Sequence, residues 1–163
     1  MTKELLFELM DTLGPSGNEE NVRKIISREI KKYVDDMKVD KMGNLVVRVK
    51  GTGRKAMLTA HMDEIGLMVN KIEKNGHLKF SVLGGIEPIT LAGQTVSILK
   101  KDNKEACKGV ISFFELHESE EIKNIPKIGD LYIDTGLTRK DVEKKGIEIG
   151  SYIVTKHKSG NLG

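Results

Sequence analysis

The sequence predicts an α/β fold in which residues 1–67 form helices and a sheet, followed by a small β-rich barrel or sandwich over residues 68–163. Two observations support this prediction. Apolar residues recur at helical spacing at the start of the chain, and short strand-like runs follow at close intervals. Helices followed by strands are typical of an α/β layer, and closely spaced short strands are typical of a barrel or sandwich.

Two amphipathic helices are expected first. The first contains Leu5, Leu6, Leu9 and Leu13, and Gly14 and Pro15 end it. The second has an apolar stripe made of Val22, Ile25, Ile26, Ile30 and Tyr33. Ser16 and Glu19 have the spacing of a capping box, which predicts that Ser16 caps the second helix.

Three strand candidates follow the helices, separated by Gly43-Asn44 and by residues 51–53: "MKVD", "NLVVRV" and "KAMLTA". The last two are nearly apolar on both faces, as in strands that are covered by helices on each side. Because only two helices precede them, we expect some apolar surface to remain uncovered. Such a surface favours association with a complementary chain or with further copies.

Six more strand candidates occur from about Leu67 onward: "GLMVNKI", "HLKFSVL", "QTVSILK", "ACKGVIS", "DLYIDTG" and "SYIVTK". Asn75-Gly76 is a strong hairpin signal, and Asp102-Asn103 predicts a second turn. A short helix over residues 138–146, ended by Gly146, interrupts the strands. This change of pattern is the reason for placing a domain boundary at residue 67.

Composition excludes several functions. No apolar run approaches the roughly 20 residues of a membrane span, and the first residues do not have the pattern of a signal peptide. Positive and negative residues are interspersed, without a basic block, so nucleic acid is not an expected partner. The single cysteine, Cys107, provides no disulfide framework and favours a reducing, cytoplasmic location. We expect Cys107 to serve in packing.

A polar island, His61, Asp63 and Glu64, lies between two apolar runs. On an extended backbone, His61 and Asp63 point to the same face while Glu64 points away. A metal-bound imidazole usually donates its second N–H to a carboxylate or carbonyl, so His-x-Asp suits a ligand and its orienting partner. A structural, hydrogen-bonded histidine is the alternative. With four histidines and 24 acids in the chain, the spacing alone does not decide between them.

Seven segments in order resemble the N-terminal half of the TET, deblocking and glutamyl aminopeptidase family, some members of which are labelled endoglucanases. These segments are "GPSGNEE", "VDKMGNLVVRVKG", "LTAHMDEIGLMV", "GGIEP", "KGVI", "DLYIDTG" and "GIEIGSYIV". The most specific is "AHMDEIG". The resemblance implies an α/β catalytic domain, to which residues 1–67 contribute, and a barrel-like dimerisation domain over residues 68–163.

The resemblance also implies a chemistry and an assembly. His61 becomes a ligand to one of two divalent metal ions, zinc or cobalt, and Asp63 the carboxylate that orients it. The resemblance implies that the substrates are peptides, which are hydrolysed from their N-terminus. It also implies that the β-rich domain joins subunits into a homo-oligomer. His117 falls where many members carry a histidine near a neighbouring active site, but the surrounding residues differ here, and a solvated loop is the simpler interpretation.

The remaining metal ligands and the general base of the family would follow the last residues, "SGNLG". One histidine and its partner do not hold a metal pair, since a zinc site normally has three or four protein ligands. We therefore expect this polypeptide alone to be inactive, as a truncated gene product, half of a split gene or an expressed fragment. The alternative is a non-catalytic oligomerisation module that pairs with a full-length or complementary chain.

Overall fold

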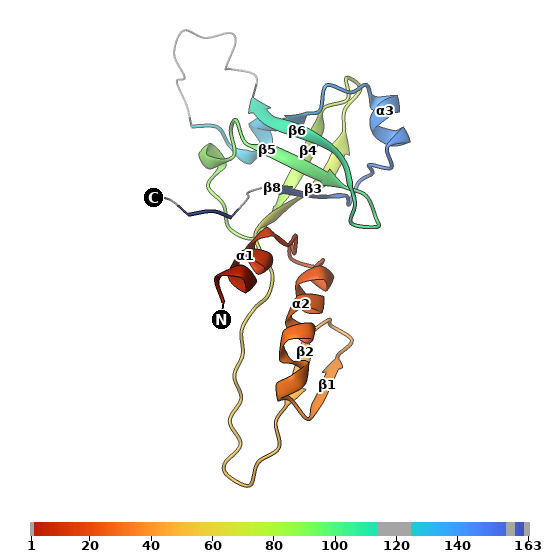
Figure 1. Cartoon of the computed structure of the whole chain (residues 1–163). Coiled ribbons are helices and arrows are strands. Elements are labelled where there is room, and N and C mark those ends of the chain that lie inside the picture. Colours follow the sequence, from red (N-terminus) through yellow and green to blue (C-terminus); the bar gives the residue numbers. More distant parts are fainter. Residues whose placement is uncertain (1, 114–124, 156–158, 162–163) are drawn as a thin grey trace. The chain divides into compact units, whose positions relative to one another are not determined.

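The computed structural model describes residues 2–113, 125–155 and 159–161 and has a mixed α/β architecture (Figure 1). It comprises two compact units, Met1–Glu64 with Lys158–Gly163, and Ile65–His157. Among the described residues, no helix has both the length and the apolar composition needed to cross a membrane.

Both predicted helices are present in the first unit. They are α1 (Lys3–Asp11) and α2 (Glu20–Ile30), the latter extended by the 3-10 turn η1 (Lys31–Tyr33). The Thr2 hydroxyl accepts a hydrogen bond from the Leu5 amide at 3.3 Å and caps α1. Arg28 on α2 joins the two helices, because its guanidinium donates to both carboxylate oxygens of Glu8, at 2.6 and 2.9 Å.

The predicted capping role of Ser16 is wrong. α2 begins at Glu20 with Glu19 as its N-cap, and Ser16 lies three residues before that cap. A turn at Gly17, with φ +87°, separates Ser16 from the helix. The Ser16 hydroxyl instead donates to the carboxylate of Asp63. The spacing of a capping box was present, but the helix starts too late for Ser16 to use it.

Two of the three strands predicted in the first unit form. They are β1 (Asp36–Val39) and β2 (Leu45–Arg48), paired antiparallel from Asp36 with Arg48 to Val39 with Leu45. The turn between them is held by Asp40, whose Oδ1 accepts from the Met42 and Asn44 amides, each at 2.9 Å. In the described part of the chain, this sheet has only these two strands.

The predicted strand over residues 55–60 is wrong. Residues 54–63 have no regular structure, and Figure 1 shows this part of the chain as a long extended connection. An extended backbone becomes a strand only when a neighbour supplies hydrogen-bond partners, and no described segment pairs with these residues. The apolar composition of residues 55–60 was therefore not sufficient to form a strand.

The predicted uncovered apolar surface is confirmed. Pro15 and Val22 are the buried apolar side chains among the described residues of the first unit. Residues 46–61 are all exposed, and the Leu58 side chain is 98% exposed. This unit therefore has very little core of its own.

The second unit is a closed barrel of six antiparallel strands in the order β3-β4-β7-β6-β5-β8. The strands are β3 (Gly66–Ile72), β4 (Leu78–Leu83), β5 (Thr95–Leu99), β6 (Glu105–Phe113), β7 (Leu131–Asp134) and β8 (Tyr152–Thr155). The connections contain the 3-10 turns η2 (Pro88–Thr90) and η4 (Ile128–Asp130) and the helix α3 (Arg139–Lys144). All six predicted strands are confirmed, and the fold is the barrel rather than the sandwich.

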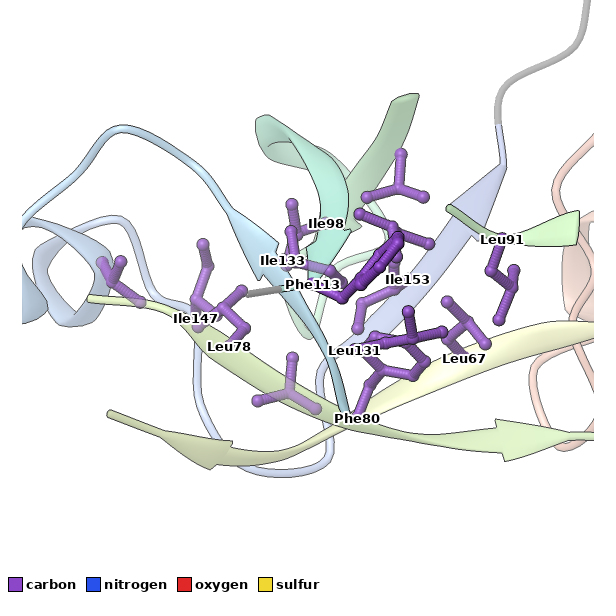
Figure 2. Close-up of a cluster of buried hydrophobic side chains, with 14 residues drawn as sticks. Leu67, Leu78, Phe80, Leu91, Ile98, Phe113, Leu131, Ile133, Ile147 and Ile153 are labelled. Carbon is purple, nitrogen blue, oxygen red and sulfur yellow. The ribbon is translucent and has the colours of Figure 1, made fainter. Parts of the chain in front are cut away.

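The barrel encloses a single apolar core of 14 buried side chains contributed by all six strands and by their connections (Figure 2). Ile98, Ile133 and Ile153, from three different strands, are each 0% exposed. Alternate residues of each strand point inward, as a closed barrel requires. The hairpin predictions also hold, because Gly76 and Asn103 have φ of +94° and +62° between paired strands.

Candidate functional site

The His61 and Asp63 side chains contact each other in the irregular segment between β2 and β3. His61 Nδ1 lies 3.0 Å from Asp63 Oδ1 and 3.1 Å from the Asp63 carbonyl oxygen. The predicted proximity of these side chains is therefore present, although the segment is not a strand. Extended backbone is sufficient to place residues two apart on one side of the chain.

This geometry defines which nitrogen of the neutral imidazole carries the proton. A backbone carbonyl only accepts hydrogen bonds, and so does an ionised carboxylate. Because both neighbours of His61 Nδ1 are acceptors, Nδ1 is the donor and Nε2 keeps its lone pair. The His61 side chain is 86% exposed, which leaves Nε2 accessible. An imidazole in this state is able to bind a metal ion.

The second oxygen of Asp63 is also engaged. Asp63 Oδ2 accepts a hydrogen bond from the Ser16 hydroxyl. This bond, and then the bond from His61, hold the pKa of the Asp63 carboxyl below its ordinary value, because both stabilise the charged form. Asp63 is therefore ionised at neutral pH and remains an acceptor toward His61.

Backbone contacts join the loop at residues 14–16 to Glu64. The Glu64 amide donates to the Gly14 carbonyl at 2.9 Å, and the Ser16 amide donates to the Glu64 carbonyl at 3.3 Å. The Glu64 side chain accepts from the Gly14 amide at 2.9 Å. A Cβ on Gly14 would lie 2.5 Å from Cγ2 of Val22, and this close approach requires glycine.

An open pocket of about 150 Å³ lies beside His61 and Asp63. The Arg23 guanidinium on α2 donates to the Gly43 carbonyl at 2.7 Å and positions the β1–β2 turn at this pocket. The pocket is lined by Glu19, Met42, Gly43, Asn44, Ala60, His61, Met62 and Asp63. The lining brings together segments that are distant in sequence, all from the first unit.

The donor chemistry fits one metal ligand with its orienting carboxylate. Within the described residues, no group of three or more His, Cys, Asp and Glu side chains is placed to hold a metal ion. A zinc site normally needs three or four protein ligands. Among the described residues, His61 with Asp63 therefore falls short of the number of ligands that an enclosed zinc site needs.

Two further candidate residues, His117 and Cys107, are distant from this pocket in sequence. His117 lies outside the described residues. Cys107, on β6 of the barrel, is half-buried, and its side chain packs against the hydrophobic core. Sequence spacing missed Ser16 as a partner of Asp63, because the two are 47 positions apart. The matching segment "GPSGNEE" was the signal that could have identified it.

The matches with known proteins cover this site and the barrel. Residues 43–163 match the M42 glutamyl aminopeptidase family, a class of aminopeptidase hydrolases. The chain belongs to this family, which confirms the resemblance seen in the sequence.

Individual aminopeptidases also match this chain. The lysyl aminopeptidase of Pyrococcus furiosus is 33% identical over 153 residues, which are 91% of this chain and 44% of that protein. The TET aminopeptidase from the marine sediment archaeon Thaumarchaeota archaeon SCGC AB-539-E09 superposes with a TM-score of 0.88 at 32% identity, over 98% of this chain and 45% of that one.

A further solved structure is TET1 peptidase from Pyrococcus horikoshii, which can assemble into a tetrahedron or a large octahedral shell. Its TM-score is 0.82 at 34% identity, over 94% of this chain and 46% of that one. The chain thus spans less than half the length of the relatives that it matches.

Proposed function

We propose that this chain is the N-terminal part of a metal-dependent aminopeptidase that removes residues from the N-terminus of peptides. The observation that carries the proposal is the His61–Asp63 pair, with Nδ1 held as a donor and Nε2 accessible. Membership of the M42 family supports the same activity.

In this proposal His61 is a ligand through Nε2, and Asp63 orients it and increases its basicity. A pair of divalent ions, zinc or cobalt, would activate water and polarise the scissile carbonyl when bound. The chain supplies one ligand among its described residues, and its relatives are more than twice as long. We therefore propose that the other ligands lie in a part of the enzyme outside these 163 residues, and that these residues alone are inactive.

A reconstitution experiment tests this function. The chain is mixed with a polypeptide that corresponds to the second half of the P. furiosus lysyl aminopeptidase, and complex formation is followed by size-exclusion chromatography. We expect release of 4-nitroaniline from amino-acid 4-nitroanilides only in the mixture and only with added zinc or cobalt. His61→Ala abolishes this activity, and Asp63→Asn weakens metal affinity by roughly 10- to 100-fold. Activity of the chain alone, or full activity of His61→Ala in the complex, would contradict the proposal.

A second candidate function is a non-catalytic module that joins subunits or pairs with a full-length relative. The barrel favours it, because the barrel is closed and has its own core. In this case the barrel joins copies of the chain into a homo-oligomer. The assembly of P. horikoshii TET1 into multi-subunit shells supports this expectation. Sedimentation velocity at micromolar concentration tests it, and a strictly monomeric species is the result against it. A cytoplasmic location agrees with the single, unpaired cysteine.

A further inference from the structure

We propose that Ser16 is a positioning residue of the candidate site, whose hydroxyl fixes the Asp63 carboxylate so that Asp63 holds His61 with Nε2 unprotonated. This inference deepens the proposed function, and its importance for catalysis rests on that function. The contacts that carry it join two segments far apart in the chain.

Asp63 uses each of its carboxylate oxygens once in this arrangement. Oδ1 accepts from His61 Nδ1 at 3.0 Å, and Oδ2 accepts from the Ser16 hydroxyl. A carboxylate with a single partner is free to rotate about its terminal torsion, which has broad minima. The second hydrogen bond removes that freedom, so Oδ1 remains directed at the imidazole. Networks of this kind orient metal-binding histidines in other proteins.

The backbone places Ser16 beside Asp63 without help from the hydroxyl. The amide of Glu64 donates to the carbonyl of Gly14, and the amide of Ser16 donates to the carbonyl of Glu64. Pro15 and Glu64 form a parallel bridge at the same point. Removing the hydroxyl should therefore leave the loop in place and change only the partner of Asp63.

Two other roles for Ser16 disagree with the geometry. A nucleophilic serine must contact the histidine that takes its proton, whereas Ser16 contacts the carboxylate, and the carboxylate lies between it and His61. A helix cap must lie at the N-cap position, which Glu19 occupies. Orienting Asp63 is the role that the contacts support.

The test is the tautomer of His61 in the metal-free 163-residue chain, measured by long-range ¹H–¹⁵N NMR at a pH where the imidazole is neutral. In the unmodified chain we expect a protonated Nδ1. Ser16→Ala should lower the ratio of the Nδ1–H to the Nε2–H form by about fivefold, the factor expected for one hydrogen bond of ordinary strength. Ser16→Thr, which keeps the hydroxyl, should restore the ratio.

Hydrogen exchange of the Glu64 amide is the control, because this amide bonds to Gly14 and reports whether the loop stays docked. The proposal requires a changed tautomer ratio with unchanged Glu64 exchange. An unchanged ratio in Ser16→Ala would overturn it. A changed ratio accompanied by faster Glu64 exchange would also overturn it, because the hydroxyl would then act by holding the loop.

Zinc added to the unmodified chain separates this inference from the proposed function. A selective shift of the His61 Nε2 resonance supports the ligand role. If zinc leaves Nε2 unperturbed while Ser16→Ala still changes the tautomer ratio, the ligand role fails and the positioning role stands. If zinc shifts the Nε2 resonance while Ser16→Ala leaves the tautomer ratio unchanged, the positioning role of Ser16 fails and the ligand role of His61 stands.

Discussion

At the scale of single residues, Cys107 on β6 is a half-buried thiol. Burial raises its pKa above the ordinary value, and Glu105 adds to this effect, while Lys145 opposes it. The neutral thiol is thus favoured in the folded state. Any stability that this group contributes is present below the pKa of an unfolded cysteine and is lost as pH rises toward the folded pKa.

We expect alkylation of Cys107 by iodoacetamide to require a higher pH than alkylation of a free cysteine, because the thiolate is the reactive form. The measurement is the alkylation rate against pH in the native protein, with the same protein in urea as the control. A native midpoint at or below that in urea would show that burial does not raise the pKa.

Gly76, in the turn between β3 and β4, has φ +94°, and a Cβ there would lie 2.0 Å from the Leu137 carbonyl oxygen. Gly76→Ala should therefore destabilise the barrel by about 1–3 kcal/mol or more, through backbone strain and this clash. Gly85→Ala is the matched control, since nothing lies within 4 Å of its Cβ position. Urea unfolding measures both, and equal stability of the two variants would contradict the prediction.

At the scale of elements, β8 closes the barrel by pairing with both β3 and β5. Ile153 of β8 lies opposite Leu67 on one side and Ile98 on the other, and its side chain is 0% exposed. A short strand therefore joins two others through one buried residue. Closure removes the sheet edges that would otherwise be open to pairing.

Ile153→Ala should lower the free energy of unfolding by about 2–5 kcal/mol, because it leaves a cavity in a closely packed core. Leu58→Ala, at a side chain that is 98% exposed, should change it by less than about 0.5 kcal/mol. Chemical denaturation followed by circular dichroism compares the two variants. A small effect of Ile153→Ala would mean that the barrel relaxes to fill the cavity.

The first unit, unlike the barrel, has an open sheet and few buried side chains. Its sheet has two short strands among the described residues, and an isolated pair of strands is marginally stable in water. Apolar side chains of its strand-like runs are exposed, among them Val46 and Val47 on β2 and Met57 and Leu58 in residues 55–60. This unit thus depends on further contacts for much of its stability.

At the scale of the whole molecule, the exposed apolar side chains should drive association. Met57 and Leu58 are 86% and 98% exposed and lie in the irregular segment that follows β2 in the sequence. We expect the double variant Met57→Ser/Leu58→Ser to have a lower weight-average sedimentation coefficient at micromolar concentration, because it removes part of this surface.

Ile149→Ser is the control for this measurement. Ile149 is 69% exposed in the barrel unit, so its replacement removes apolar surface outside the first unit. An unchanged sedimentation coefficient in the double variant, together with a decrease in Ile149→Ser, would assign association to the barrel instead.

Several elements could be predicted from the sequence because their signals are local. The two helices follow apolar stripes such as the one containing Val22 and Ile26, and the hairpin at Asn75-Gly76 needs a residue that tolerates positive φ. The His61–Asp63 contact also joins residues two apart, so an extended backbone is sufficient to bring them together.

The errors concern features that depend on distant partners. Residues 55–60 have the composition of a strand, but a strand also needs a neighbour, and no described segment pairs with them. Ser16 has the spacing of a helix cap, but it bonds to Asp63, 47 positions away. Neither the absence of this strand nor the partner of Ser16 can be predicted from the neighbouring residues in the sequence.

The sequence by itself indicated the family, through seven ordered segments that resemble it. It also indicated the local elements and the His61–Asp63 contact, because these depend on apolar periodicity and on short spacings. Only the tertiary structure decided that β8 closes the barrel between β3 and β5, and that Ser16 completes the contacts of Asp63. The physical reason is that hydrogen bonds between distant segments form where the fold brings donors and acceptors together, and no local pattern records which segments will meet.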